Sequence, residues 1–327
     1  MLTSKILIVY SKRYGRGIGQ VDSEIALIND YASEQSLKLL SENSHWNADG
    51  TFRTAPSLFT QAYYIHVWDE FSMKAVVYSC CEDKTEEGYR HLFTSLVTYA
   101  NTKNITLNPS SVLIDFEQGA INAINYVFPQ ALVKGCHFHF AQNVWKKLKK
   151  YGLVKLSKEE NIRRGIANII SLPLIPPNEI NNCMERIIDK LSNINSKFDR
   201  LTDYVINNYI DEGRFPVDMW NHFDNIGERP RTNNHLEGFH RQLNARVRTH
   251  PDLWTWINDV KSTEEAVMCR YEQEQAQKRT TRPRKGRYIH DDTKLILAKQ
   301  NIFKNTDRGA IENKIVAYCD EFGFIGK

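Results

Sequence analysis

Three acidic residues occupy positions that suit metal-dependent chemistry on phosphate esters. Asp49 lies within or at the end of an expected strand, Asp115 ends the apolar run VLID, and Glu237 lies early in an expected helix. The carboxyl ends of strands in open α/β sheets face the ligand crevice, so an Asp that ends a buried strand is a site candidate. Converging carboxylates supply the hard oxygen ligands that Mg²⁺ and Mn²⁺ prefer. A pair of such ions is the usual apparatus for in-line attack on phosphodiesters.

Two of these acids also fit ordinary structural roles. The dipeptide Asp49-Gly50 is a turn signal. The segment from Asn234 to Glu237 fits a capping box, with Asn234 as the N-cap and Glu237 at the third helical position. The residue pattern alone therefore leaves both the metal triad and the structural roles open.

The segments around the acids predict an α/β core with a mixed sheet. Three runs rich in aromatic and β-branched residues predict a meander of strands: HWNADGTF, QAYYIHVWDEF and MKAVVYSCCED. A helix over 85–101, a buried strand SSVLIDFE, a helix over 118–127, a strand ALVKGC and a helix from His139 to about Tyr151 should follow. From Lys158 to about Asn225 the amphipathic patterns are helical only, which predicts an all-helical insertion that interrupts the core.

These patterns predict a division of the chain into five parts. We expect an N-terminal stub, the first part of the core, the helical insertion, the completion of the core with the third acidic residue, and a basic C-terminal tail. Their expected ranges are 1–35, 36–157, 158–228, 229–270 and 271–327.

Positive charge is gathered in three segments, although the formal net charge of the 327 residues is only +4. Met1–Gln20 has four basic residues and no acid, Lys134–Arg164 has nine against two, and Arg229–Arg287 has thirteen against seven. Segregation of this kind is typical of proteins that bind phosphate backbones, whereas each run alone is equally typical of a solvated face. The candidate DNA contacts are Lys146, Lys147, Lys149, Lys150, Arg241, Arg246 and Arg248. Stacking on bases is open to Trp145, Trp254 and Trp256, but we expect each in the core.

Composition excludes several other classes of protein. The longest apolar-rich stretch, 165–177, is too short and too rich in proline to cross a bilayer, which needs about 20 apolar residues. The N-terminus lacks the pattern of a secretory signal. Six cysteines in a chain of this length are not a disulfide framework, so we expect buried thiols, or a metal ligand among them, in a reducing compartment. No membrane partner is expected.

Three blocks of the sequence resemble the conserved blocks of the MULE (Mutator-like element) transposase domain. They are WNADGTFRTAPSLFTQAYYIH, LNPSSVLIDFEQGAINAINYVFPQALVKGCHFHFAQNVWKKL and PRTNNHLEGFHRQLN, and the resemblance covers roughly 36–256. It implies an RNase H-like core of the DDE type, in which Asp49, Asp115 and Glu237 are the catalytic acids and the ligands of two Mg²⁺ or Mn²⁺ ions. It also implies DNA as partner, in the form of element terminal repeats and target DNA, with a homo-oligomer on that DNA and a nuclear location.

The resemblance also places the family's Cys-x2-His pair on Cys136 and His139. A structural zinc site needs four ligands, and the second pair is not obvious, with His137, His235 and His240 as candidates. The alternative is a buried thiol beside a histidine that orders the helix. His240 is three residues after Glu237 and so on the same helix face, where it would orient that carboxylate, contact DNA or have a plain surface role.

We therefore expect a transposase catalytic domain that cleaves DNA ends and transfers the freed strand. One alternative is a domesticated or truncated copy that binds DNA without catalysis. Members of the family usually carry an upstream zinc-finger module, and Met1–His45 contains no Cys/His finger pattern. Another is an RNase H-like nuclease that cleaves without joining.

Overall fold

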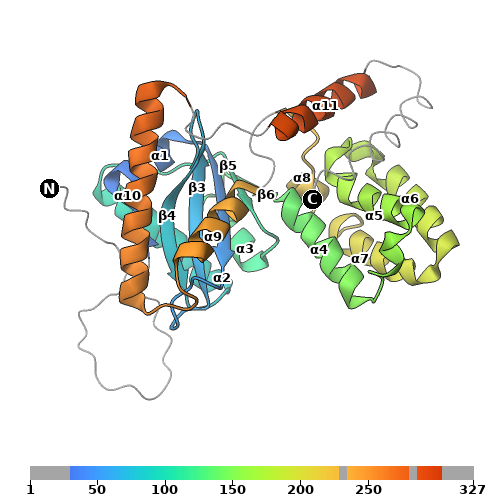
Figure 1. The fold of residues 1–327 in the computed structure, drawn as a ribbon, viewed down its shortest axis with the longest axis horizontal. Helices are drawn as coiled ribbons and strands as arrows, with labels where there is room; N and C mark the ends of the chain where they lie inside the picture. Colours follow the sequence, from blue (N-terminus) through green and yellow to red (C-terminus); the bar gives the residue numbers. More distant parts are fainter. Residues whose placement is uncertain (1–29, 228–233, 280–285, 304–327) are drawn as a thin grey trace. The chain divides into compact units, whose positions relative to one another are not determined.

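The computed structural model describes residues 30–227, 234–279 and 286–303, which belong to two compact units (Figure 1). The first unit comprises Met1–Val133 and Asn233–Arg282, and the second comprises Lys134–Thr232 and Pro283–Lys327. The N-terminal stub expected over 1–35 lies mostly outside the described residues. The predicted boundaries at 157 and 228 stay predictions.

A six-stranded mixed sheet forms the centre of the first unit, with the order β1-β4-β3-β2-β5-β6. The pairs β1–β4, β3–β4 and β2–β3 are antiparallel, and β2 pairs with β5 in parallel. This arrangement confirms the predicted RNase H-like mixed sheet. The strands are β1 (Asp30–Tyr31), β2 (His45–Thr51), β3 (Gln61–Trp68), β4 (Met73–Cys81), β5 (Ser111–Ile114) and β6 (Leu132–Gly135).

Helices cover both faces of this sheet. Neighbouring residues of a strand point to opposite faces, so contacts of consecutive residues show which helix lies on which face. Tyr63 of β3 packs edge-on against Tyr89 of α2, whereas Tyr64 packs against Phe239 of α9. On the α9 face, Leu243 and other side chains of α9 and α10 form a buried apolar cluster with β3 and β4; Figure 1 shows α9 and α10 in front of the strands. The helices of this unit are α1 (Glu34–Glu42), α2 (Glu86–Thr102), α3 (Gln118–Val127), α9 (Asn234–Arg246) and α10 (Leu253–Gln277).

In the second unit, the described residues after the end of β6 form helices and no strand. This confirms the predicted all-helical insertion. Its core includes Phe140, whose ring stacks on Trp220 at 5.4 Å and meets Tyr209 edge-on at 4.8 Å. The helices are α4 (His137–Lys150), α5 (Glu160–Ser171), α6 (Ile180–Ile194), α7 (Asp199–Tyr209), α8 (Val217–Trp220) and α11 (Gly286–Phe303), with 3-10 turns η1 (Leu156–Lys158), η2 (Leu172–Leu174), η3 (Pro177–Glu179) and η4 (Ser196–Phe198).

Two helical features were not expected from the sequence. The segment expected only as a basic tail contains the end of α10 and all of α11.

In the part of the chain that the structure describes, no helix has both the length and the apolar character that crossing a membrane requires.

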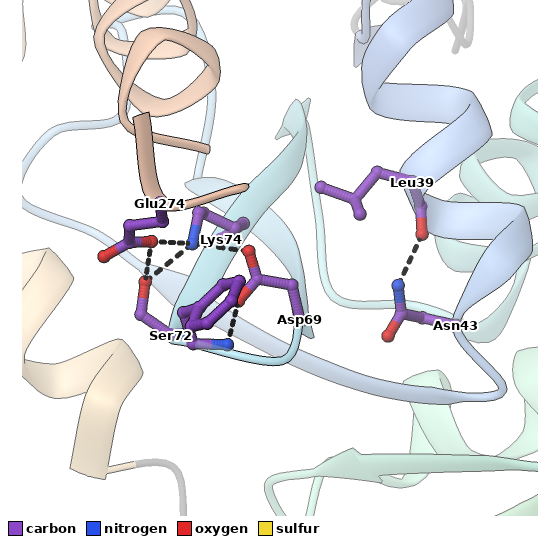
Figure 2. Close-up of polar contacts among 7 residues, drawn as sticks. Leu39, Asn43, Asp69, Ser72, Lys74 and Glu274 are labelled. Atoms are coloured by element: carbon purple, nitrogen blue, oxygen red, sulfur yellow. Dashed lines mark hydrogen bonds and ion pairs between the residues drawn. The ribbon is translucent and has the colours of Figure 1, made fainter. Parts of the chain in front are cut away.

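A buried group of charges fastens the C-terminal part of α10 to the β3–β4 turn (Figure 2). The Lys74 Nζ lies 2.7 Å from Oδ2 of Asp69 and 2.7 Å from Oε2 of Glu274, and all three side chains are buried. Ser72 donates its hydroxyl to the same oxygen of Glu274 at 3.0 Å. Ten residues earlier in α10, Glu264 accepts a hydrogen bond from the Ser36 hydroxyl at 2.7 Å. These contacts hold α10 against the β3–β4 turn and against α1.

Replacement of the central cation of this group should destabilise the fold strongly. The Lys74→Met variant leaves two buried carboxylates without their cation, so the free energy of unfolding should fall by about 3–5 kcal/mol in urea titrations. The matched control is Lys38→Met, which removes an exposed ion pair with Glu34 and should change that free energy by less than about 1 kcal/mol. Equal effects of the two variants would contradict the role given to Lys74.

Candidate functional site

The parallel pairing of β2 with β5 brings Asp49 and Asp115 to one edge of the sheet. Trp46 is paired with Val112 and Asn47 with Leu113. Asp49 comes two residues after Asn47 and Asp115 two residues after Leu113, so both acids lie at the carboxyl end of this parallel pair. Both acids also raise the pKa of the Tyr63 hydroxyl. The structure therefore places the two predicted acids at the same end of the sheet.

Asp49 is buried and held from two sides. Its Oδ1 accepts a hydrogen bond of 2.9 Å from the backbone N–H of Gly50. Its pairing partner in β3 is Tyr64, so its side chain points to the face that α9 covers. A Cβ atom at Gly50 would lie 2.5 Å from Oε1 of the buried Gln61, so a side chain there would require the Gln61 side chain to shift. The Asp-Gly pair is thus part of a strand, not the turn that its composition also allowed.

The imidazole of His240 lies against Asp49, with Nδ1 3.7 Å from its Oδ2. Burial lowers the pKa of His240 to about 4, so its ring is neutral at physiological pH. The sequence suggested that His240 would orient Glu237 or lie on the surface, but it is buried and contacts the first acid. Glu237 is in the same helix, three residues earlier, and its side chain lies outside the described residues.

A second carboxylate follows Asp115 and belongs to a polar network that the sequence analysis missed. The backbone N–H of Glu117 donates to Oδ1 of Asp115 at 3.2 Å. The Glu117 carboxylate pairs with Lys84 and accepts the hydroxyl of Tyr89, which in turn accepts a hydrogen bond from Gln61. The only signal in the sequence was an acid two residues after the predicted one, in IDFE.

The hydroxyl of Tyr63 is buried beside these acids and makes no hydrogen bond with any described residue. Burial raises its pKa well above the usual value, and the charges of Asp115, Glu117 and Asp49 raise it further, in that order. Tyr63 therefore stays a neutral phenol at physiological pH. Sequence reasoning took it only as a strand residue.

Deeper along the same strands lies a buried polar pair, Asn47 and His66, which are opposite each other in the β2–β3 ladder. Neither ring nitrogen of His66 makes a hydrogen bond with a described residue, and its ring meets Phe239 edge-on at 4.9 Å. Burial lowers the pKa of His66 well below its ordinary value, and His240 lowers it further. The signal in the sequence for this buried polar pair was that Asn47 and Asp49, two residues apart, lie on the same face of β2.

No group of three or more His, Cys, Asp or Glu residues that could hold a metal ion is found among the residues that the structure describes. The side chains of Glu237 and His235 lie outside the described residues. Cys136 is fully buried and precedes α4, and the ring of His137 hydrogen-bonds to the carbonyl of Ile170 at 2.8 Å. Zinc binding by Cys136 and His139 stays a prediction.

The predicted basic contacts lie on both units. Arg241, Arg246 and Arg248 are exposed on and just after α9 in the first unit. The lysines of α4 belong to the second unit, where Lys146, Lys149 and Lys150 are exposed and Lys147 lies over the ring of Tyr204. Their expected place beside the crevice stays a prediction.

Of the three tryptophans expected in the core, one is buried and two are exposed. Trp256 is buried, as expected, in the cluster beneath α9. Trp254 is 71% exposed and Trp145 is 38% exposed, so the expectation was wrong for both. The helical period explains the exposure of Trp254: α10 turns Trp256, Ile257 and Val260 toward the sheet, and a residue two positions before Trp256 faces away.

Residues 45–143 match the family model described as the MULE transposase domain. This match confirms the resemblance that the sequence blocks indicated. It includes β2 and β5, and so both Asp49 and Asp115, whereas Glu237 lies beyond it. A search of curated proteins finds none that matches the chain.

The first turn of α3 should tolerate no side chain at Gly119. A Cβ atom there would lie 2.6 Å from the carbonyl oxygen of Lys84 and 3.0 Å from the backbone nitrogen of Glu86. Since backbone cannot yield cheaply, Gly119→Ala should lower the free energy of unfolding by about 1–3 kcal/mol. Gly238→Ala, in α9 with open space around it, should instead raise it by about 0.5–1 kcal/mol. Chemical denaturation measures both, and a neutral Gly119→Ala would contradict the close approach.

Burial of His66 should make stability depend on pH. Because the folded-state pKa is depressed, the unfolded chain binds more protons than the folded one below about pH 6.5, so stability falls as the pH falls. The cost is about 1.4 kcal/mol per pH unit until the folded-state pKa is reached. His66→Leu should remove this part of the slope in urea titrations from pH 7 to 4.5. A slope identical to that of the wild type would contradict the assignment.

Proposed function

Because residues 45–143 of this chain match the MULE transposase domain, we propose that the chain is the catalytic domain of a DDE-type transposase, which cleaves DNA at element ends and transfers the freed strand to target DNA. The observation that supports the proposal is the parallel pairing of β2 with β5, because Asp49 and Asp115 each come two residues after the last paired residues, Asn47 and Leu113. Glu237, in the helix whose His240 contacts Asp49, is the proposed third acid.

The donor set at this edge fits a hard divalent cation. Asp49 and Asp115 offer carboxylate oxygens, and the adjacent His240 is neutral, so it brings no positive charge that would compete for them. Mg²⁺ or Mn²⁺, when bound as a pair, would supply an activated nucleophile and a stabilised leaving oxygen. Asp49 and Asp115 would hold the pair, and Glu237 would complete the coordination.

The protein's own contribution is to hold these carboxylates in place before substrate arrives. The Gly50 amide and the His240 ring restrain Asp49, while the backbone of Glu117 restrains Asp115. Lys84 is paired with Glu117 and so keeps that extra carboxylate away from a ligand role. The exposed Arg241, Arg246 and Arg248, with the lysines of α4, would bind DNA phosphates.

The proposal extends to the setting in which such a domain works. A transposase acts on chromosomal DNA, so we place the chain in the nucleus, bound to terminal repeats and then to target DNA as a homo-oligomer. The zinc pair Cys136 and His139 would order the start of α4.

Substitution of either acid should abolish catalysis without unfolding the chain. Asp115→Asn and Asp49→Asn should each lower cleavage and strand transfer by at least about 100-fold, because the metal's contribution is several kcal/mol. The assay uses duplexes that carry the inverted repeats flanking the coding sequence, a supercoiled plasmid target, and Mg²⁺ or Mn²⁺. Asp203→Asn, at an exposed position of α7, is the matched control and should retain full activity.

The products separate the alternatives. Joined products that depend on both acids support the transposase, cleaved ends without joining indicate a nuclease, and binding without cleavage indicates a domesticated copy. Full activity of Asp115→Asn would refute the proposed site.

A further inference from the structure

Three large apolar side chains are exposed on two segments whose backbones are hydrogen-bonded to each other. Phe52 is 53% exposed, Leu58 is 75% exposed and Trp254 is 71% exposed. Phe52 and Leu58 lie in the loop that joins β2 to β3, and Trp254 lies in the first turn of α10. A single exposed apolar residue needs no explanation, but a group of them on one surface is typical of an interaction site.

The two segments form one continuous surface, because their backbones are bonded to each other. The amide of Ser57 donates to the carbonyl of Pro251 at 3.1 Å, and the amide of His250 donates to the carbonyl of Arg53 at 3.0 Å. The side chain of Arg53 donates to the Thr249 hydroxyl at 3.3 Å. We call this surface, Phe52–Leu58 together with Arg248–Trp254, the aromatic rim.

The exposure does not come from a loose loop. Ala55 and Phe59, on either side of Leu58, are buried in the cluster beneath α9. The amide of Phe59 donates to the carbonyl of Pro56 at 2.8 Å, and that of Thr60 to the carbonyl of Cys81 at 2.9 Å. The chain thus holds Phe52, Leu58 and Trp254 outward on a fixed frame.

The aromatic rim begins next to the proposed catalytic acids. Phe52 comes three residues after Asp49, and the ammonium group of Lys84 lies 4.3 Å from the centre of its ring. The same Lys84 pairs with Glu117, whose amide is bonded to Asp115. Phe52 is therefore connected to Asp115 through Lys84 and Glu117.

The charge of the aromatic rim fits a polyanion. Arg53 and Arg248 are exposed on it, and Arg246 lies just before it. Its one acid, Asp252, caps α10 by accepting hydrogen bonds from the amide of Thr255 at 2.9 Å and from its hydroxyl at 2.6 Å. Flat rings interleaved with arginines bind single strands, because rings stack on bases and guanidinium groups bind phosphates.

We propose that the aromatic rim binds unpaired bases of the DNA strand that enters the proposed active site, with Phe52 and Trp254 as the stacking side chains. This inference rests on the proposed function for the identity of the strand. Bases are accessible to stacking only where the duplex is open, so the aromatic rim selects single-stranded DNA over duplex at the point of cleavage.

The test measures DNA binding by the full chain without metal, so that binding is separated from catalysis. Fluorescence anisotropy reports binding of a labelled dT12 strand and of a 12-base-pair duplex in EDTA. Phe52→Ala and Trp254→Ala should each weaken binding of the single strand about tenfold while they change duplex binding by less than about threefold. Trp254→Phe keeps a flat ring and should restore most of the affinity. The control is Tyr126→Ala, which removes another exposed ring, 63% exposed on α3.

Two results would overturn the proposal: wild-type affinity of both alanine variants for the single strand, or an equal loss for strand and duplex. Failure of the aromatic rim is distinguishable from failure of the proposed function. A chain that cleaves DNA in an Asp115-dependent way but binds single strands without Phe52 and Trp254 refutes only the rim. Ring-dependent binding without any metal-dependent cleavage refutes only the proposed function.

Discussion

The parallel pairing of β2 with β5 is the contact on which the rest of the first unit depends. Asn47 opposite Leu113 fixes the register, and a slip of one residue would turn Asp49 to the other face of the sheet. In the observed register Asp49 is beneath α9, where His240 meets it, and Asp115 comes directly after β5. The position of α3 follows, because Glu117 is the N-cap of that helix and Gly119 lets the helix approach the backbone at Lys84–Glu86.

This register has a cost, because it buries polar groups. Asp49 and His66 are buried beneath α9, and His240 of α9 is buried on the side that faces the sheet; burial depresses the pKa values of both histidines. Polar groups are buried at such a cost where function requires them. The apolar cluster around Leu243 offsets the cost and keeps α9 on the sheet.

The long helix α10 secures this arrangement from outside the site. It is bound to the β3–β4 turn by the buried Lys74 group and to α1 by Glu264. Its first turn presents Trp254 outward beside the β2–β3 loop. One helix therefore both stabilises the sheet and supplies part of the proposed DNA surface.

The sequence predicted the elements that carry a strong local pattern. The strands with β-branched and aromatic runs, and the helix Gln118–Val127, end within a few residues of their predicted limits. Asp49 and Asp115 were found because each lies at a strand end and within a recognisable block.

What the sequence did not reveal depends on contacts between distant segments. Lys84 pairs with Glu117, 33 residues further on, and Lys74 pairs with Glu274, two hundred residues further on. The sequence predicted that His240 and Glu237 share a helix face, because the helical period relates residues three positions apart. The contact of His240 with Asp49 joins residues far apart in the sequence and is visible only in the folded structure. Nothing in the local pattern distinguishes the exposed Trp254 from the buried Trp256 without knowledge of the face that α10 turns to the sheet.

Titration of the full chain with Mn²⁺ in a calorimeter tests the central claim most directly, that Asp49, Asp115 and Glu237 share a metal site. The wild type and Asp203→Asn should bind Mn²⁺ with the same affinity. Asp49→Asn, Asp115→Asn and Glu237→Gln should each weaken that binding by at least about tenfold. Absence of Mn²⁺ binding by the wild type, or unchanged binding by the three variants, would contradict the account.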